Sequence, residues 1–175
     1  VSLVAARHNW AEVQEKVKVV GRETGRSSEA DKLLAQLDAQ WSSVQAQVAK
    51  AQRKPRVLFV LSHSGSPQVA GKGTAANALI QYAGCVNAID QFDGYKPLTA
   101  EAMASAAPEV IINTTQGIEA LGGEAAFWKR PELALTPAYA KKALVTLEAS
   151  HLLGFGPRLP SAVQALHMRA LQWVA

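Results

Sequence analysis

The unbroken apolar run at residues 57–61 constrains the fold of this chain more than any other feature of its sequence. Its five side chains, Val-Leu-Phe-Val-Leu, are typical of a strand that is covered on both faces of a sheet. A polar loop follows at 62–70, and residues 71–74 open a helical pattern. A buried strand that leads through a loop into a helix indicates an α/β sheet, in which ligands meet the loops at the carboxyl ends of the strands.

The chain beyond this helix continues to alternate strand and helix. Two further strands are predicted at 109–114 and 144–147, and a capping box at Ser161 predicts the start of a last helix that runs towards Trp173. This alternation predicts a mainly parallel sheet with helices on both faces. The remaining predicted elements are helices at 75–83, 99–106 and 117–121, a turn at 93–97 and a loop at 154–158.

The first 54 residues have a different, mostly helical pattern. A capping box at Ser28 predicts the start of a long amphipathic helix, which extends on the order of 37 Å at 1.5 Å per residue if it reaches Arg53. Such a helix either packs along the core of one domain or forms a rigid strut between two lobes. Before it, the pattern predicts a short strand at 1–5 and a helix at 10–20 that ends at Gly21 and Gly25.

Composition excludes several classes of protein. A chain of 175 residues with 49% apolar content can bury a core, and no run approaches the roughly 18 apolar residues of a membrane span. The formal charge of +4 is spread over helices without interleaved aromatic residues, so no nucleic-acid partner is expected. The single cysteine, Cys85, cannot form an internal disulfide and is expected to be a small buried residue. No zinc-protease, CxxC or nucleophile-elbow motif occurs, so an enzyme is not expected.

Three places carry chemistry that could bind a ligand, and each has a plain alternative. His63 follows the first buried strand and could bind a metal, although a loop histidine is more often a surface residue. The helix start at 71–74, with Lys72, could attract an anionic group, or its glycines could only permit close packing. The polar residues at 114–117 could bond a ligand, although capping of the next helix is the more common role.

Taken together, five ordered segments resemble the periplasmic haemin-binding proteins of bacterial haem ABC importers. The resemblance covers nearly all of residues 56–175. The segments are Leu61-Ser62-His63, residues 70–76, residues 94–98, residues 114–123 and residues 154–158.

Membership of that family implies a two-lobed periplasmic protein that holds haem in the cleft between its lobes and delivers it to an inner-membrane permease. Residues 1–27 would then be a remnant of the N-terminal lobe, 28–54 the bridging helix and 55–175 the C-terminal α/β lobe. The sequence departs from the family because the bulk of the N-terminal lobe, which commonly supplies the tyrosine that ligates the iron, is absent.

The resemblance also implies roles for individual residues. His63 corresponds to an axial ligand of the haem iron, and Tyr95 and Tyr139 are further candidates because haem iron accepts tyrosine. The expected contacts to the haem propionates or edge are Lys72, Gly73, Thr74 and Gln116.

Two other functions remain open at the level of sequence. A protein of the same importer class could bind a siderophore or cobalamin instead of haem. Alternatively, the chain could be an assembly domain whose cleft surface contacts another copy. Because a chain without most of one lobe would leave an apolar stripe of the long helix uncovered, self-association is expected.

Overall fold

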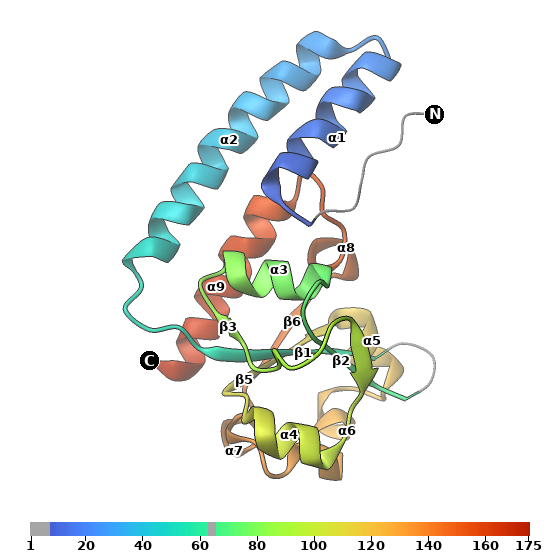
Figure 1. Ribbon diagram of the computed structural model, residues 1–175, viewed down its shortest axis with the longest axis vertical. Helices are drawn as coiled ribbons and strands as arrows, with labels where there is room; N and C mark the ends of the chain where they lie inside the picture. The colour runs from blue at the N-terminus through green and yellow to red at the C-terminus, as the bar shows by residue number, and fades with distance from the viewer. Residues whose placement is uncertain (1–7, 63–65) are drawn as a thin grey trace.

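The computed structural model describes residues 8–62 and 66–175, and the strand expected at 1–5 lies outside them. Within the described residues, a six-stranded sheet has the order β4-β2-β1-β5-β6, with β3 also paired to β1 (Figure 1). The strands are β1 (Arg56–Leu61), β2 (Gln68–Ala70), β3 (Val86–Asn87), β4 (Tyr95–Pro97), β5 (Val110–Thr114) and β6 (Leu144–Leu147).

The parallel part of this sheet contains the three strands that the sequence predicts and one two-residue strand, β3, that it does not. Strand β1 pairs in parallel with β3 and β5, and β5 pairs in parallel with β6. The predicted strands at 57–61, 109–114 and 144–147 are confirmed. All five residues of β5 are buried, as expected for a strand covered on both faces.

Two short antiparallel strands extend one side of the sheet and were not predicted. Strand β2 pairs with β1, and β4 pairs with β2. Strand β4 occupies most of the segment predicted as a turn at 93–97, so that prediction is wrong for its last three residues. A three-residue strand has no readable alternation, and Pro97 is tolerated because β4 is an edge strand.

Helices cover both faces of the sheet, as predicted. Helices α3 and α9 lie on one face, and α4, α6 and α7 lie on the other (Figure 1). The helices around the sheet are α3 (Ala75–Tyr82), α4 (Ala100–Ala106), α5 (Thr115–Ala120), α6 (Glu124–Trp128), the 3₁₀-helix η1 (Pro131–Leu133), α7 (Pro137–Lys141), α8 (Ala149–Leu152) and α9 (Leu159–Val174). No helix among the described residues is long and apolar enough to cross a membrane.

A helical hairpin precedes the sheet. Helix α1 (Trp10–Glu23) packs against the long helix α2 (Ser27–Lys50), and α2 in turn packs along α9 (Figure 1). Trp10 stacks on Trp41 with ring centroids 4.8 Å apart, and its indole N–H donates to Asp38 at 3.1 Å. These contacts join the start of α1 to the middle of α2.

The predicted start of α2 is wrong in its detail. The helix begins at Ser27, Arg26 takes the N-cap position, and no side chain caps the helix, so Ser28 forms no capping box. The turn between α1 and α2 sets this start, because the Arg26 N–H donates to the Gly21 carbonyl at 2.7 Å. Gly21 also continues α1 where the sequence predicted its end, and a Cβ at this position would lie 2.5 Å from the Ala30 methyl group.

The capping box predicted at Ser161 is also wrong. Helix α9 begins at Leu159, and its N-cap is Arg158, three residues before Ser161. The Ser161 hydroxyl donates to the Arg158 carbonyl at 2.8 Å instead of accepting from a helix N–H. Pro160 in the first turn suits this earlier start, because a proline there loses no helical hydrogen bond.

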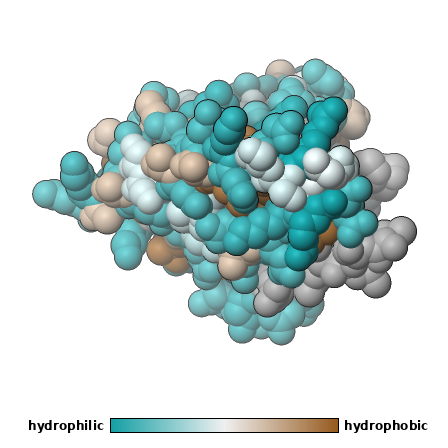
Figure 2. Space-filling view, turned by 90° about the horizontal axis from the view of Figure 1, so that it is seen from above, coloured by the Kyte–Doolittle hydropathy of each residue, from teal (hydrophilic) through white to brown (hydrophobic). Residues whose placement is uncertain are grey.

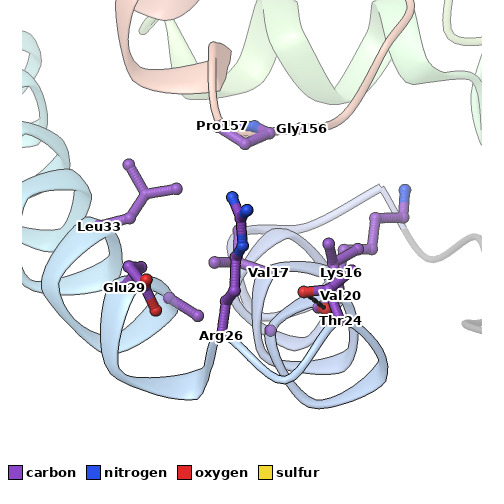
Figure 3. A pocket seen from close by; sticks show the side chains of 11 residues that line it. Lys16, Val17, Val20, Thr24, Arg26, Glu29, Leu33, Gly156 and Pro157 are labelled. Carbon is purple, nitrogen blue, oxygen red and sulfur yellow. Dashed lines mark hydrogen bonds between the residues drawn. The ribbon is translucent and has the colours of Figure 1, made fainter.

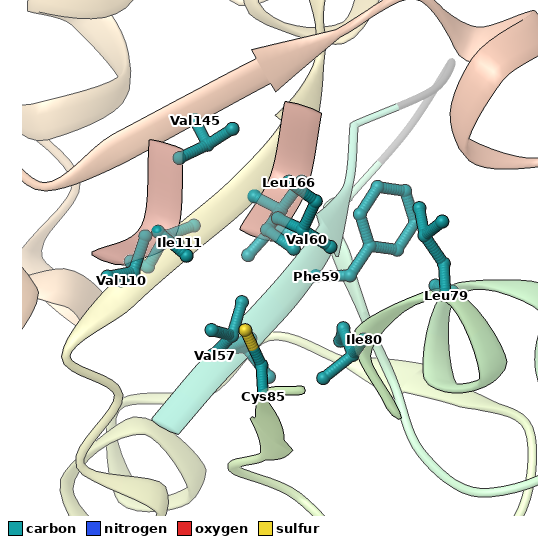
Figure 4. Packing of buried hydrophobic residues seen from close by; sticks show 14 of the residues in the cluster. Val57, Phe59, Val60, Leu79, Ile80, Cys85, Val110, Ile111, Val145 and Leu166 are labelled. Carbon is teal, nitrogen blue, oxygen red and sulfur yellow. The ribbon is translucent and has the colours of Figure 1, made fainter. Parts of the chain in front are cut away.

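The core extends over both faces of the sheet, and one part of it lies between the sheet and the α3–α9 layer. Phe59 and Val57 of β1 pack with Leu79 and Ile80 of α3 and with Leu166 of α9 (Figure 4). Cys85 lies in this cluster, so its prediction as a small buried residue is confirmed. Burial raises the pKa of the Cys85 thiol to about 12.

Candidate functional site

The carboxyl ends of β1 and β5 meet in a buried polar contact at one edge of the sheet. Asn113, near the end of β5, is fully buried, and its amide donates to the Ser62 hydroxyl at 2.9 Å. The Asn113 side-chain oxygen, Oδ1, accepts from the Thr114 backbone N–H at 2.8 Å. A buried amide is stable only when its polar atoms are paired in this way, so Asn113 fixes the position of Ser62. Ser62 directly precedes His63 in the sequence.

The segment 114–117 caps a helix, as the sequence analysis favoured. Thr114 is the N-cap of α5, and its hydroxyl accepts from the Gly117 N–H at 2.9 Å. Gly117 is needed at this position because a Cβ there would lie 2.4 Å from the Asn113 side-chain oxygen and 3.0 Å from the Ser62 carbonyl. The close approach of α5 to the end of β1 therefore depends on this glycine.

Gln116 joins the end of β5 to the end of β6. Its amide donates to Glu148 at 2.6 Å, and its carbonyl oxygen accepts from the Ala149 N–H at 3.2 Å. Gln116 is exposed, but both ends of its amide group already have partners. The residue therefore lies at the predicted edge of the sheet and also holds α8 in place.

The loop at 71–74 lies between β2 and α3. Thr74 is buried and caps α3: its hydroxyl accepts from the Asn77 N–H at 3.0 Å and donates to the Gly71 carbonyl at 2.9 Å. Gly73 has a φ of +72°, which favours glycine, and a Cβ there would meet open space. Lys72 is exposed, and its backbone bonds Phe92 and Gly94.

The two glycines of this loop differ in role: one permits close packing, and the other leaves the backbone open to an anionic ligand, the two alternatives that the sequence left open. Close packing is the role of Gly71, because a Cβ there would lie 2.3 Å from the Phe92 carbonyl oxygen. The backbone at Gly73 is uncovered beside the exposed Lys72, at the start of an eight-residue helix. Thus Lys72 and Gly73 are open to a ligand, whereas the Thr74 hydroxyl is used by the fold.

His63, the predicted iron ligand, lies outside the described residues. No group of three or more histidine, cysteine, aspartate or glutamate side chains that could hold a metal ion occurs in residues 8–62 and 66–175. A haem iron needs fewer protein ligands than such a cluster supplies, because the porphyrin occupies four of its positions.

The two tyrosines that the sequence analysis considered lie away from this edge of the sheet. Tyr95 is in β4, and burial raises the pKa of its phenol, which disfavours the phenolate that would bind iron. Tyr139 is in α7, on the face opposite α3, and the Lys142 ammonium lies 3.2 Å from the centroid of its ring. Neither side chain follows the carboxyl end of a parallel strand.

Arg158 is a candidate that the residue assignments missed. It ends the loop 154–158, is exposed, and its guanidinium donates to the Ser150 hydroxyl at 3.4 Å. These two residues line a shallow pocket of about 240 Å³ together with Gly154, Gly156 and Pro157. The signal in the sequence was an arginine directly after a glycine-rich loop that follows a predicted strand and a short helix.

A second pocket, of about 300 Å³, lies between the α1–α2 hairpin and the same loop (Figure 3). Val17, Val20 and Leu33 form apolar walls, and Arg26 points across the pocket towards Gly156 and Pro157 (Figure 3). Val20 is 60% exposed and Leu33 is 37% exposed. From the end where the two helices meet, the surface is largely hydrophilic, with hydrophobic residues visible in its recesses (Figure 2).

Comparisons with known proteins agree with this architecture. The solved structure of the periplasmic heme-binding protein BhuT in complex with two hemes is 43% identical to this chain, with a TM-score of 0.92. The match covers 97% of this chain and 65% of that one. The periplasmic heme-binding protein RhuT from Roseiflexus sp. RS-1 is 30% identical, with a TM-score of 0.91 and coverages of 96% and 65%.

A third structure, the periplasmic heme-binding protein HutB of Vibrio cholerae, is 26% identical with a TM-score of 0.82, and the match covers 98% of this chain and 67% of that one. This chain therefore spans 65% of the length of the BhuT and RhuT chains. No curated protein matches its sequence.

The family comparison decides the classification. The model of the periplasmic binding protein family matches residues 2–150, which is most of the chain. The mainly parallel sheet with helices on both faces is the fold of the solved structures named above. The chain belongs to the periplasmic binding protein family.

Proposed function

We propose that this chain binds haem and serves in its import. The observation that carries the proposal is the 43% identity, over 97% of this chain, to BhuT, whose structure contains two hemes. RhuT and HutB, which are also named heme-binding proteins, support it. The open edge of the sheet is the kind of place where proteins with parallel sheets bind ligands.

In this proposal the haem lies against the edge formed by the ends of β1, β5 and β6. His63 supplies an axial nitrogen to the iron. The two propionates are carboxylates, which exposed cations attract, so Lys72 and Arg158 are their proposed partners. Gly73, Thr74 and Gln116 contact the haem edge, Thr74 through its backbone because its hydroxyl already has two partners.

Titrations with three ligand classes test the choice of ligand. Haemin, a ferric hydroxamate siderophore and cyanocobalamin are added separately to the purified chain, and quenching of the fluorescence of its four tryptophans is followed. We expect saturable quenching by haemin with an affinity at least about tenfold above that of the other two, a difference of about 1.4 kcal/mol. Equal or reversed affinities would favour the siderophore or cobalamin alternative. Absence of saturable binding by all three would contradict ligand binding.

The wider setting is also part of the proposal. We infer that α2 bridges two lobes, with residues 1–27 belonging to one lobe and 55–175 to the other. The long α1–α2 hairpin that extends beyond the sheet domain supports this division (Figure 1). We further infer that the chain works in the periplasm, as the names of the solved relatives support, and that it delivers haem to an inner-membrane permease, as the resemblance to haem importers implies. A pull-down of the permease by the haem-loaded chain tests that step.

Self-association is a second proposal, carried by the apolar pocket beside the α1–α2 turn. The exposed Val20 and Leu33 lie in it beside Arg26 and Glu29, so two copies that meet face to face would pair opposite charges around an apolar centre. Light scattering should give a dimeric mass for the parent and a monomeric mass for Val20→Asp. A monomeric parent at high concentration would contradict association.

A further inference from the structure

A buried carboxylate near the start of α1 is not explained by the proposed haem contacts. Glu12 is 1% exposed, and the Lys16 ammonium lies 2.6 Å from its Oε1. A charge buried to this extent is retained only with a closely placed partner, because removal of a carboxylate from water is costly. The pair Glu12–Lys16 therefore holds the lysine side chain in one direction.

That direction leads to the loop that carries Arg158. The Lys16 ammonium also donates to the Phe155 carbonyl at 3.1 Å, a contact between residues 139 positions apart in sequence. Phe155 is buried, and it stands three residues before Arg158. The same lysine thus connects the first helix to the loop 154–158.

His8 closes the arrangement from the other side. Its backbone N–H donates to Glu12 Oε2 at 2.7 Å, and its ring meets the Phe155 ring edge-on, with centroids 5.5 Å apart. His8 has a φ of +50°, a conformation that is uncommon for a residue with a side chain and persists only where the surroundings impose it. The hydrogen bond to Glu12 and the ring contact with Phe155 impose this conformation on His8.

The loop is held at Phe155, which lies in the buried core cluster with its ring centroid 6.5 Å from that of Tyr82, and the contacts of His8 and Lys16 add to this hold. After Phe155 the loop is more open, because the nearest atom to a Cβ at Gly156 would be 3.8 Å away, and Arg158 is exposed. Its connections to the rest of the lobe include the bond from the Leu159 N–H to the Gly156 carbonyl and the weak bond from Arg158 to Ser150. A fixed Phe155 therefore limits where the Arg158 guanidinium can stand.

We propose that His8, Glu12 and Lys16 form a clasp that positions Arg158 for an anionic ligand group, so that the start of α1 and the ligand edge move as one unit. The ligand half of this proposal rests on the proposed function, in which the anionic groups are haem propionates. The three clasp residues act through Phe155 and do not touch the ligand themselves.

Two readouts on Lys16→Met test the clasp, with Lys18→Met as the matched control. Lys18 is an exposed lysine on the same helix, so the same substitution there leaves the clasp intact. Amide hydrogen exchange of residues 154–158 without ligand should be at least about tenfold faster in Lys16→Met than in the parent and the control. The double variant Glu12→Gln with Lys16→Met should show the same acceleration without an unpaired buried charge.

The second readout compares haemin with its dimethyl ester, in which the propionates are neutral. The parent should prefer haemin, and both Lys16→Met and Arg158→Ala should reduce that preference several-fold. The conservative variant Lys16→Arg should restore it. A purely structural role would weaken both ligands equally and leave the preference unchanged.

Unchanged exchange in residues 154–158 would overturn the clasp whatever the ligand result. Accelerated exchange with an unchanged haemin preference would overturn its role in positioning Arg158. A parent that binds neither haemin nor its ester would instead overturn the proposed function and the ligand half of the clasp, while the exchange result would still decide whether Lys16 fixes the loop.

Discussion

The substitution Gly117→Ala tests the contact between the ends of β1 and β5 most sharply. The added Cβ would lie 2.4 Å from Asn113 Oδ1, 2.8 Å from Thr114 Oγ1 and 3.0 Å from the Ser62 carbonyl. Overpacking of this kind costs about 1–3 kcal/mol, and displacement of Asn113 would weaken hydrogen bonds worth about 0.5–1.5 kcal/mol each. Alanine gains about 1 kcal/mol over glycine in a helix, which offsets part of this cost.

We therefore expect Gly117→Ala to lower the free energy of unfolding by about 1–3 kcal/mol. For a domain of this size the melting temperature would fall by roughly 2–12 °C. Urea unfolding followed by circular dichroism measures the first quantity and thermal unfolding the second. Gly156→Ala is the matched control, because the nearest atom to its Cβ would be 3.8 Å away and a change within about 0.5 kcal/mol is expected. A Gly117→Ala variant as stable as the parent would refute the proposed tight contact.

Three further predictions concern caps, rings and the buried thiol. Thr74→Ala should lower the free energy of unfolding by about 1 kcal/mol, because α3 loses its N-cap; chemical unfolding measures this. Trp41→Leu should lower it by about 1–3 kcal/mol and reduce the near-ultraviolet dichroism, because two ring contacts, to Trp10 and Tyr82, are lost. The Cys85 thiol, with its pKa raised from 9.0 to about 12, should react with a thiol reagent at pH 8 only after unfolding. Since the unfolded thiol ionises first, its contribution to stability is complete below pH 9 and is lost as the pH rises towards 12; reaction of the native protein at pH 8 would contradict its burial.

Strands β1 and β5 could be predicted because they are buried on both faces. Continuous apolar runs at β1 and β5 leave a readable signal, and the helices between them have clear apolar periods. Strands β2 and β4 have three residues each, and their pairing depends on the path of the chain rather than on a local pattern. Local sequence also misplaced the starts of α2 and α9, because the turn at Arg26 and the loop before Leu159 decide where those helices begin.

The candidate site was predictable in outline and not in its partners. A histidine after a buried strand and a glycine-bearing loop before a helix are visible in the sequence, and so is the cap at Thr114. The bond from Gln116 to Glu148 joins residues 32 positions apart, and the contact from Lys16 to Phe155 joins residues 139 apart. Such pairs arise from the tertiary fold, so no spacing rule could have found them.

A haemin titration of the parent and His63→Ala, followed at the Soret band, tests the central claim most directly. His151→Ala is the matched control, since His151 is a partly exposed histidine on α8 to which no iron is assigned. The account predicts a saturable, red-shifted band in the parent and the control and an altered band in His63→Ala. A parent without a saturable shift would contradict haem binding by this chain, and a band unchanged in His63→Ala would contradict His63 as the iron ligand.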